Sequence, residues 1–303
     1  MRLGLMTAAL PMLDLDQLAI WAAESGYQML EIACWPPAGA TRRYGGVTHI
    51  DVTDLDRQRA REIRAKIADR GLDISSLGYY PNPLDPDPSV SEAAFAHIKR
   101  VIDAAALLEV EIVGTFIGAD MTKSSDQNLE TFAKVWPPIV KYAGERGIKI
   151  AIENCPMLWQ DTWPSGTNLA TTPAVWTRMF EIIPDANFGL NYDPSHLIWQ
   201  FIDYIRPIHE FTDRIFHVHA KDMRIDRDML YRDGVLGCGF RWAIPKLPGL
   251  GEVDWAAFAS ALYEVGYDFV ISVEHEDRSF EGTEEAVKRG FYLTRDTLKP
   301  LIH

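Results

Sequence analysis

The sequence predicts an α/β fold, and within that class a single (β/α)8 TIM barrel spanning residues 1–303. Two patterns and the chain length support this prediction. Eight short β-rich runs alternate with longer stretches in which apolar residues recur about every 3.6 positions. Several helical stretches close with a repeated phrase, seen in ESGYQ, DRGLDI, ERGIKI and EVGYDF, in which a glycine suited to a left-handed C-cap precedes the next strand. A chain of 303 residues without a linker or low-complexity segment has the usual length of one such barrel.

The predicted strands are short apolar runs, and the predicted helices fill the stretches between them. The strands are residues 2–7, 27–33, 73–80, 111–118, 149–155, 188–193, 215–222 and 269–276. The clearest helical stretches are residues 15–26, 55–71 and 93–110. An open parallel sheet is the alternative arrangement. No GxGxxG motif opens a helix after a strand, so the barrel is preferred.

The composition indicates a globular protein with a large core and an acidic surface. Hydrophobic residues make up 47% of the chain, charged residues make up 24%, and the net charge is −13. Such a surface repels phosphate backbones, and the lysines and arginines are dispersed, so no nucleic-acid partner is expected. No apolar run approaches the roughly 20 residues that span a bilayer, so no membrane association is expected either.

Cysteine usage and the first residues predict a cytoplasmic protein. Cys34, Cys155 and Cys238 lie far apart and form no CxxC pair, which indicates a reducing compartment rather than a zinc-thiolate site or a disulfide framework. The N-terminal stretch is apolar like the core of a secretory signal. However, Asp14 and Asp16 end it early and no cleavage-type segment follows, so it is interpreted as the first strand.

The long predicted loops all follow strands, at residues 34–52, 81–90, 155–171 and 223–253. In a barrel, the loops that follow strands surround the carboxyl ends of the strands, where active sites lie. This places the predicted functional face on one side of the molecule.

Four residues near the ends of the last four predicted strands form a candidate metal site. They are Glu153 in KIAIENCP, Asp193 in FGLNYDPSH, His219 in FHVHAKD and Glu274 in FVISVEHED. Carboxylate and imidazole donors suit Mn²⁺, Mg²⁺, Co²⁺ or Zn²⁺, and the lack of a thiolate in this set removes any strong preference for zinc. The four strand ends are expected to converge around one half of the barrel mouth.

Glu153 and Glu274 are also the predicted catalytic residues. A cation that holds a ketone oxygen and an adjacent hydroxyl acidifies the carbon-bound proton between them. One glutamate can remove that proton and the other can return it, which gives epimerisation or aldose–ketose isomerisation through an enediolate.

Further residues near the predicted mouth are candidates for substrate binding. His196 completes a DxxH element with Asp193; substrate binding is favoured for it over ligation of a second metal or capping of the next helix. Lys221 shares a strand face with His217 and His219, so it either binds a substrate oxygen or pairs with Asp222 or another carboxylate. His217 is either a substrate contact or a buried, hydrogen-bonded histidine.

Aromatic and basic residues on the long loops complete the set. Trp35 is expected to present a flat apolar face to a sugar ring, with packing inside the barrel as the alternative. The same two interpretations apply to Tyr79, Tyr80, Trp159, Trp163 and Trp199. Arg241, next to Trp242 in a loop longer than a βα turn requires, is expected to belong to a lid.

These motifs resemble the xylose isomerase-like superfamily of sugar isomerases, epimerases and inosose dehydratases, which also includes DNA-repair enzymes of the endonuclease IV type. The resemblance is carried by AIEN, NYDPSH, HVHAKD and VEHED, and by PGLGEVDW at residues 248–255. It implies that Glu153, Asp193, His219 and Glu274 bind one metal, usually Mn²⁺ or a similar ion. It also implies that the two glutamates act as acid and base, and that His196 contacts the substrate.

At two places this sequence departs from the patterns of particular branches of the superfamily. Ketose 3-epimerases have an arginine a few residues past the ligand histidine, where this chain has Ile225 next to Arg224. The DNA-repair branch needs additional histidines after earlier strands, but the third and fourth strands here lead into GYYPNP and GTFIGAD. The DNA-repair activity is therefore not expected.

The leading hypothesis is a metal-dependent sugar isomerase or epimerase that acts on a free sugar or cyclitol. The alternative is a lyase or dehydratase that eliminates a β-substituent from a keto-sugar, keto-glycoside or inosose. For that reaction, Lys221, His196 and His217 are the candidate acids. A non-catalytic metabolite-binding barrel is a third, less favoured hypothesis. The resemblance also suggests a homo-oligomer, since barrels of this kind are often dimers or tetramers.

Overall fold

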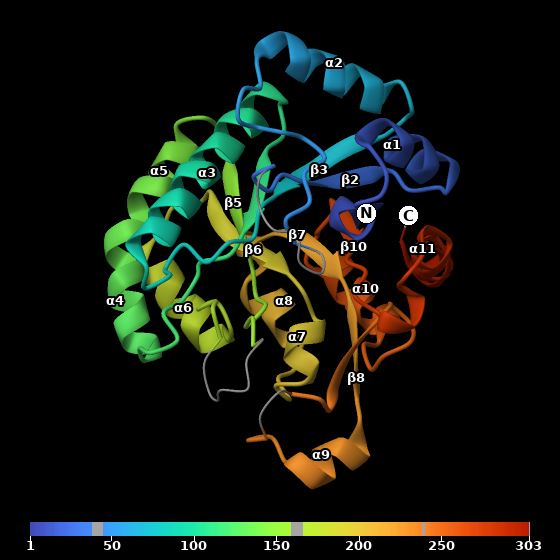
Figure 1. Cartoon of the computed structure of the whole chain (residues 1–303). Helices are drawn as coiled ribbons and strands as arrows, with labels where there is room; N and C mark the ends of the chain where they lie inside the picture. The colour runs from blue at the N-terminus through green and yellow to red at the C-terminus, as the bar shows by residue number, and fades with distance from the viewer. Residues whose placement is uncertain (38–44, 159–165, 238–239, 303) are drawn as a thin grey trace.

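The computed structural model describes residues 1–37, 45–158, 166–237 and 240–302, and in them the chain forms a closed barrel of eight parallel strands (Figure 1). The strands follow one another around the barrel in the order β1-β10-β7-β6-β5-β4-β3-β2. They are β1 Arg2–Met6, β2 Met29–Ala33, β3 Asp73–Gly78, β4 Ile112–Thr115, β5 Lys149–Glu153, β6 Phe188–Tyr192, β7 Ile215–Ala220 and β10 Val270–Val273. Each strand lies within one of the eight predicted runs, so the barrel prediction is confirmed.

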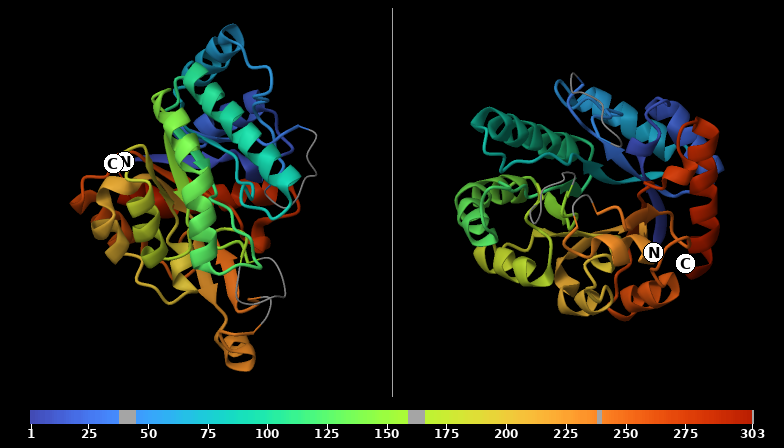
Figure 2. Two further views of the ribbon diagram at one scale, coloured as in Figure 1. Left: turned by 90° about the vertical axis from the view of Figure 1, so that its left-hand side faces the viewer. Right: turned by 60° about the horizontal axis from the view of Figure 1, so that its bottom comes forward.

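Helices surround the barrel on its outer side (Figure 2). They are α1 Leu15–Glu24, α2 Arg57–Ala68, α3 Pro88–Leu107, α4 Ser125–Val135, α5 Pro137–Gly144, α6 Pro173–Ile182, α7 Ser195–Ile198, α8 Arg206–Glu210, α9 Arg227–Asp233, α10 Trp255–Glu264 and α11 Glu284–Leu298. Short 3-10 turns occupy Thr7–Ala9, Thr212–Arg214, Arg278–Phe280 and Lys299–Leu301. No helix in the described part of the chain has both the length and the apolar character needed to cross a membrane.

Local sequence signals explain where the helices begin and end. Asp14, which ends the apolar N-terminal stretch, caps α1 by accepting a hydrogen bond from the backbone N–H of Gln17, and the Gln17 side chain bonds back to the Asp14 backbone. At the other end of the α/β repeat, the glycines of the repeated phrase adopt left-handed backbone angles, with φ of +72° at Gly71 and +74° at Gly266. This conformation is unfavourable for residues with a Cβ atom, so the chain turns sharply from helix to strand at these glycines.

The segment after β7 differs from the expectation of one long loop at residues 223–253. It contains β8 Asp222–Ile225 and β9 Ala243–Lys246, which pair antiparallel, with α9 between them. Figures 1 and 2 show α9 projecting away from the barrel. Trp242 is buried against Met223 and Ile225 in a small separate core. Four-residue strands carry too little periodicity to be recognised, which is why the sequence indicated only a loop.

Asp222 anchors the base of this arm and the segment before α10. Its carboxylate accepts hydrogen bonds from the backbone N–H groups of Gly249 and Val253 and from Trp255 Nε1, at 3.0–3.1 Å. A Cβ atom on Gly251 would lie 2.2 Å from Asp222 Oδ1, so only glycine fits there. The PGLGEVDW motif is thus explained by packing around a buried carboxylate.

Candidate metal centre

The four predicted ligands come from four neighbouring strands. Glu153 is the last residue of β5, Asp193 directly follows β6, His219 is next to last in β7, and Glu274 directly follows β10. These strands are consecutive in the barrel order. One oxygen or nitrogen atom of each residue lies within 4.8 Å of the matching atom of every other. The structure therefore brings all four side chains to one point.

Three buried oxygen or nitrogen atoms at this point make no hydrogen bond to the described residues. They are Asp193 Oδ2, His219 Nδ1 and His196 Nε2. The other oxygen of Asp193 accepts a bond from the backbone N–H of Ser195 at 2.8 Å, which turns Oδ2 towards its neighbours. His219 Nδ1 lies 3.4 Å from Glu274 Oε2 and 3.8 Å from Glu153 Oε1. Leaving buried polar atoms unpaired is costly. A shared divalent cation with oxygen and nitrogen ligands would satisfy these atoms, so the residues fit such an ion.

The two glutamate carboxylates of the site are held in their charged form. Burial alone would raise the pKa of Glu153, but the neighbouring His196, His219 and Lys221 side chains hold it well below its usual range. Burial also acts to raise the pKa of Glu274, and the Lys221 ammonium outweighs this effect and lowers the pKa. The site thus concentrates negative charge in a buried place, which favours cation binding.

Lys221 lies inside this group of acids rather than beside Asp222. Its Nζ atom is 2.6 Å from Glu274 Oε2, 3.1 Å from Asp193 Oδ2 and 3.5 Å from Glu276 Oε2. Burial would lower the pKa of Lys221, but Asp193 and Glu274 raise it well above its usual value. Pairing with a nearby carboxylate was one of the two expectations for Lys221, and its partners are the acids of the metal site itself.

His196 lies at the edge of the same group. Its Nε2 atom is 3.3 Å from Asp193 Oδ2 and 3.5 Å from Glu153 Oε1. No side chain caps α7, so the interpretation of His196 as a helix cap is wrong. Cys155 lies close enough to His196 and Glu153 to form a second potential ligand group. Burial raises the pKa of the Cys155 thiol, which disfavours the thiolate form that binds metals.

The site opens into a cavity of about 640 Å³, part of which is open to solvent. Its charged wall contains Glu153, Lys221, Glu274 and Glu276. The remaining wall is largely apolar and includes Met6, Trp35, Tyr80, Phe116 and Met157. Trp35 thus lies where a flat apolar face can meet a bound molecule.

Other predicted residues lie elsewhere. Tyr79 packs against the ring of His97, and Trp199 packs against Phe240 and Trp242. Arg241 is not part of the cavity lining; its side chain is 68% exposed and pairs with Asp233 at 3.1 Å. Its predicted role in substrate binding gains no support from this position. Trp159 and Trp163 lie outside the described residues.

His217 lies deeper in the barrel than His219 and is fully buried. Its ring nitrogens are 2.9 Å from Asn191 Oδ1 and 3.1 Å from Ser75 Oγ. Burial lowers its pKa to about 4, so the ring is neutral at physiological pH. This is the buried, hydrogen-bonded histidine that the sequence left as one of two interpretations.

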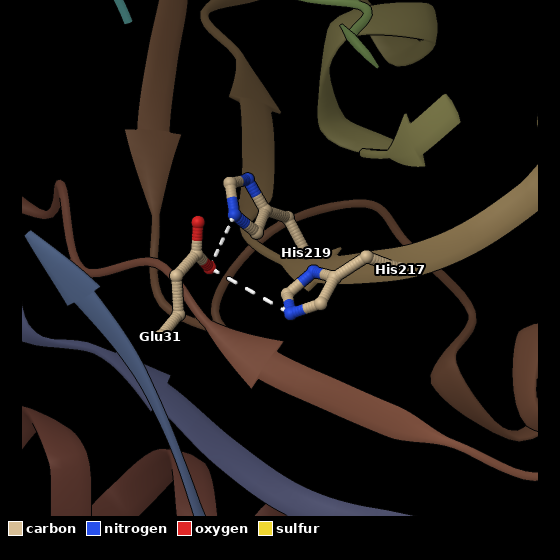
Figure 3. Close-up of side chains that lie close together, drawn as sticks. All are labelled: Glu31, His217 and His219. Atoms are coloured by element: carbon tan, nitrogen blue, oxygen red, sulfur yellow. Dashed lines mark hydrogen bonds and ion pairs between the residues drawn. The ribbon is translucent and has the colours of Figure 1, made fainter. Parts of the chain in front are cut away.

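Glu31 is a functional candidate that the sequence analysis missed. It lies on β2, is completely buried, and turns its carboxylate towards His219 and His217 (Figure 3). The signal was present in the sequence, since Glu31 is the only charged residue in the strand-like run YQMLEIA. A lone carboxylate in a barrel strand is costly unless it has partners.

The fold is shared with proteins whose structures have been solved. A D-psicose 3-epimerase from Clostridium cellulolyticum H10, solved with D-tagatose, superposes with a TM-score of 0.72 over the full length of both chains at 16% identity. The IOLI protein, solved with a zinc atom, superposes with a TM-score of 0.71, covering 100% of this chain and 99% of that one at 18% identity. At these identities, the similarity shows the fold alone.

Sequence comparison adds the family. The uncharacterised protein YfiH of Bacillus subtilis strain 168 is 26% identical over 91% of this chain and 93% of its own. An inosose dehydratase of Geobacillus thermodenitrificans is 28% identical over 42% of this chain and 44% of its own. Residues 19–296 match the model of the xylose isomerase-like TIM barrel. The chain therefore belongs to the xylose isomerase-like TIM-barrel family.

Proposed function

We propose that this protein is a metal-dependent enzyme that removes the proton beside a carbonyl group of a sugar or cyclitol and returns it, giving an epimer or isomer. The main support is the set of four donor side chains at adjacent strand ends, in which three carboxylates share one lysine and His219 Nδ1 is buried without a hydrogen-bond partner among the described residues. A module that only bound a metabolite would not need two glutamates in such a set.

In this proposal Glu153, Asp193, His219 and Glu274 hold the cation, Mn²⁺ or a similar ion. When bound, such an ion polarises the substrate carbonyl and stabilises the negative charge that develops as the neighbouring proton leaves. Glu153 and Glu274 come from strands on opposite sides of β6 and β7 in the barrel order, so they approach the substrate from different directions. One carboxylate accepts the proton from carbon, and the other donates a proton to the opposite face.

Lys221 and His196 are the proposed contacts to substrate oxygens. The Lys221 ammonium lies at the charged wall of the cavity, where it can donate to a developing oxyanion. His196 Nε2 lies beside Asp193 and Glu153, so it can contact a hydroxyl next to the reacting carbon. Trp35 provides an apolar surface for the C–H face of the ring.

Elimination is the second candidate reaction, and the position of Lys221 favours it. The first half is the same: a glutamate removes the proton beside the carbonyl. The electron pair then expels a hydroxyl or alkoxy group from the β-carbon, and Lys221 donates the proton that releases it as water or an alcohol. The partial similarity to inosose dehydratases agrees with this course.

One experiment separates the two reactions. The Mn²⁺-loaded protein is incubated in D₂O with a panel of free ketoses, an inosose and 3-keto-glycosides, and the small molecules are analysed by NMR after removal of Mn²⁺. Epimerisation or isomerisation gives a product with deuterium at the reacting carbon. Elimination gives an unsaturated keto product and a released alcohol or water. Absence of exchange and of product with every member of the panel would contradict the proposed function.

A further inference from the structure

We propose that Glu31 is a positioning residue for the metal centre, which holds the His219 ring so that its Nδ1 atom faces Glu153 and Glu274. The proposal rests on the proposed function only in taking His219 as a metal ligand. It adds a fifth strand, β2, to a site otherwise built from β5, β6, β7 and β10.

The central observation is the contact between Glu31 and the far side of the His219 ring. Glu31 Oε2 lies 2.8 Å from His219 Nε2, and both side chains are fully buried (Figure 3). An ionised carboxylate can only accept hydrogen bonds, so the nitrogen at this distance must carry the proton. In a neutral ring, Nδ1 then keeps its lone pair. Nδ1 is the atom that faces the acids of the site and has no hydrogen-bond partner among the described residues.

Glu31 is itself held in place by other strands. Ser272 Oγ donates to the same Oε2 atom at 3.1 Å, and the Tyr80 hydroxyl donates to Oε1 at 2.5 Å. Glu31 Oε2 thus lies within hydrogen-bond distance of both Ser272 and His219, and Oε1 is occupied by Tyr80. A charged group with every oxygen occupied cannot turn away from His219 without leaving partners unpaired.

Two glycines make room for this network. A Cβ atom on Gly114 would lie 2.4 Å from the Tyr80 hydroxyl oxygen. A Cβ atom on Gly78 would lie 3.2 Å from Glu31 Oε1 and 3.0 Å from the Tyr80 ring. The strands β3 and β4 therefore have no side chain where the Tyr80–Glu31 pair needs space.

Asn191 and His217 do not perform the same task. Asn191 Nδ2 is 2.9 Å from His219 Nε2, but it also donates to the Tyr80 hydroxyl at 3.0 Å. The proton on His219 Nε2 is donated to Glu31, so this nitrogen cannot accept a bond from the Asn191 amide. The amide therefore donates to the Tyr80 hydroxyl instead. His217 Nε2 is 4.0 Å from Glu31 Oε2. This nitrogen bonds to Ser75 Oγ, and His217 Nδ1 bonds to Asn191 Oδ1. A separate cation site between Glu31, His217 and His219 is therefore disfavoured.

The physical consequence concerns metal affinity. A carboxylate behind a ligating imidazole fixes its orientation and makes the ring a stronger donor, and loss of such a partner weakens metal binding by about 10–100-fold. Glu31 is not among the residues that line the cavity, so its effect on the metal passes through His219.

The test compares Glu31→Gln and Glu31→Met with wild type and with Ser75→Ala as a matched control. Ser75 bonds to His217 in the same buried layer but not to Glu31 or His219. The first quantity to measure is the dissociation constant for Zn²⁺, by chelator competition. We also record the Nε2–H resonance of His219 in Zn²⁺-loaded, ¹⁵N-histidine-labelled protein, assigned with His219→Gln. Circular dichroism checks the fold of each variant.

Both Glu31 variants should bind Zn²⁺ about 10–100-fold more weakly, with the larger loss for methionine, which accepts no hydrogen bond. The His219 Nε2–H resonance should move upfield in Glu31→Gln and exchange rapidly in Glu31→Met. Ser75→Ala should keep both properties. If Glu31→Met fails to fold, Glu31→Gln decides the question.

Unchanged affinity in the Glu31 variants, or an equal loss in Ser75→Ala, would overturn the inference. If D₂O exchange is absent for wild type but the Glu31 variants lose affinity as expected, the proposed reaction fails and the inference stands. If exchange occurs and affinity is unaffected, only the inference fails. A wild-type protein that binds no divalent cation would overturn both.

Discussion

At the scale of single residues, the site is recognised by an excess of negative charge and by a buried histidine nitrogen, His219 Nδ1, without a hydrogen-bond partner among the described residues. Three carboxylates and one imidazole meet at the barrel mouth, and Lys221 is the only lysine or arginine that contacts them among the described residues. One ammonium group cannot neutralise three carboxylates. A buried excess of negative charge is expensive unless it binds a cation, which is why these residues carry the functional argument.

The two glutamates give the first prediction. Glu153→Gln and Glu274→Gln keep the size of each side chain but cannot exchange a proton at neutral pH. Each should lower kcat in the D₂O exchange assay by about 10²–10⁴-fold. The far-ultraviolet circular dichroism spectrum should stay as in wild type. Glu284→Gln, on the outside of α11, is the control and should leave kcat unchanged. Full activity in both site variants would favour a non-catalytic binding barrel.

At the scale of elements, the buried carboxylate of Asp222 lies at the base of the β8–α9–β9 arm. The Asp222 carboxylate accepts hydrogen bonds from the Trp255 indole N–H and from the backbone N–H groups of Gly249 and Val253. These bonds connect the arm to α10. The arm follows β7, which carries His219, so its anchoring lies next to the metal site along the chain.

This anchoring predicts a graded loss of stability. Asp222→Ala leaves several buried N–H groups unpaired and should lower the free energy of unfolding by about 2–4 kcal/mol. Trp255→Phe removes one bond and should cost roughly 1 kcal/mol. Asp233→Asn breaks only the exposed pair with Arg241 and should change stability by no more than about 0.5 kcal/mol. Urea unfolding measures all three, and a stability loss in Asp222→Ala no larger than in Asp233→Asn would contradict the anchoring role.

At the scale of the whole molecule, buried histidines remote from the metal site link folding to pH. His97 packs under Tyr79 and lies 2.7 Å from the Cys34 carbonyl oxygen, and His49 lies between Thr7 and Leu13. Burial lowers the pKa of both rings below the usual value of 6.5. The unfolded chain therefore binds protons at these histidines at a higher pH than the folded protein does.

The sign of the effect follows directly. Stability from the neutral rings is present above about pH 6.5 and is lost as the pH falls below that value. The contribution of these two histidines to the free energy of unfolding should thus decrease between about pH 7 and pH 5. His97→Gln keeps a donor for the Cys34 carbonyl but does not titrate, so it should reduce this slope. Urea unfolding at several pH values provides the measurement, and an unchanged slope in the variant would show that His97 does not contribute.

Much of the architecture was predictable because it depends on local patterns. Alternating strand and helix periods, with glycines at the helix ends, leave few ways to close eight β/α units other than a barrel. The short strands β8 and β9 escaped prediction, since Trp242 finds its core only against Met223 and Ile225. Arg241 was expected near the mouth from its loop, but its side chain is exposed and pairs with Asp233 on α9.

The sequence by itself determined the barrel and the meeting of Glu153, Asp193, His219 and Glu274, because parallel strands in a closed barrel deliver their carboxyl ends to one face. Only the tertiary structure decided what stands behind and between these residues. Glu31 and His219 are 188 positions apart, and Lys221 is 53 positions from Glu274. No local pattern reports such contacts. They arise because strand closure brings side chains together inside the barrel, where each buried charge must find a partner or a ligand.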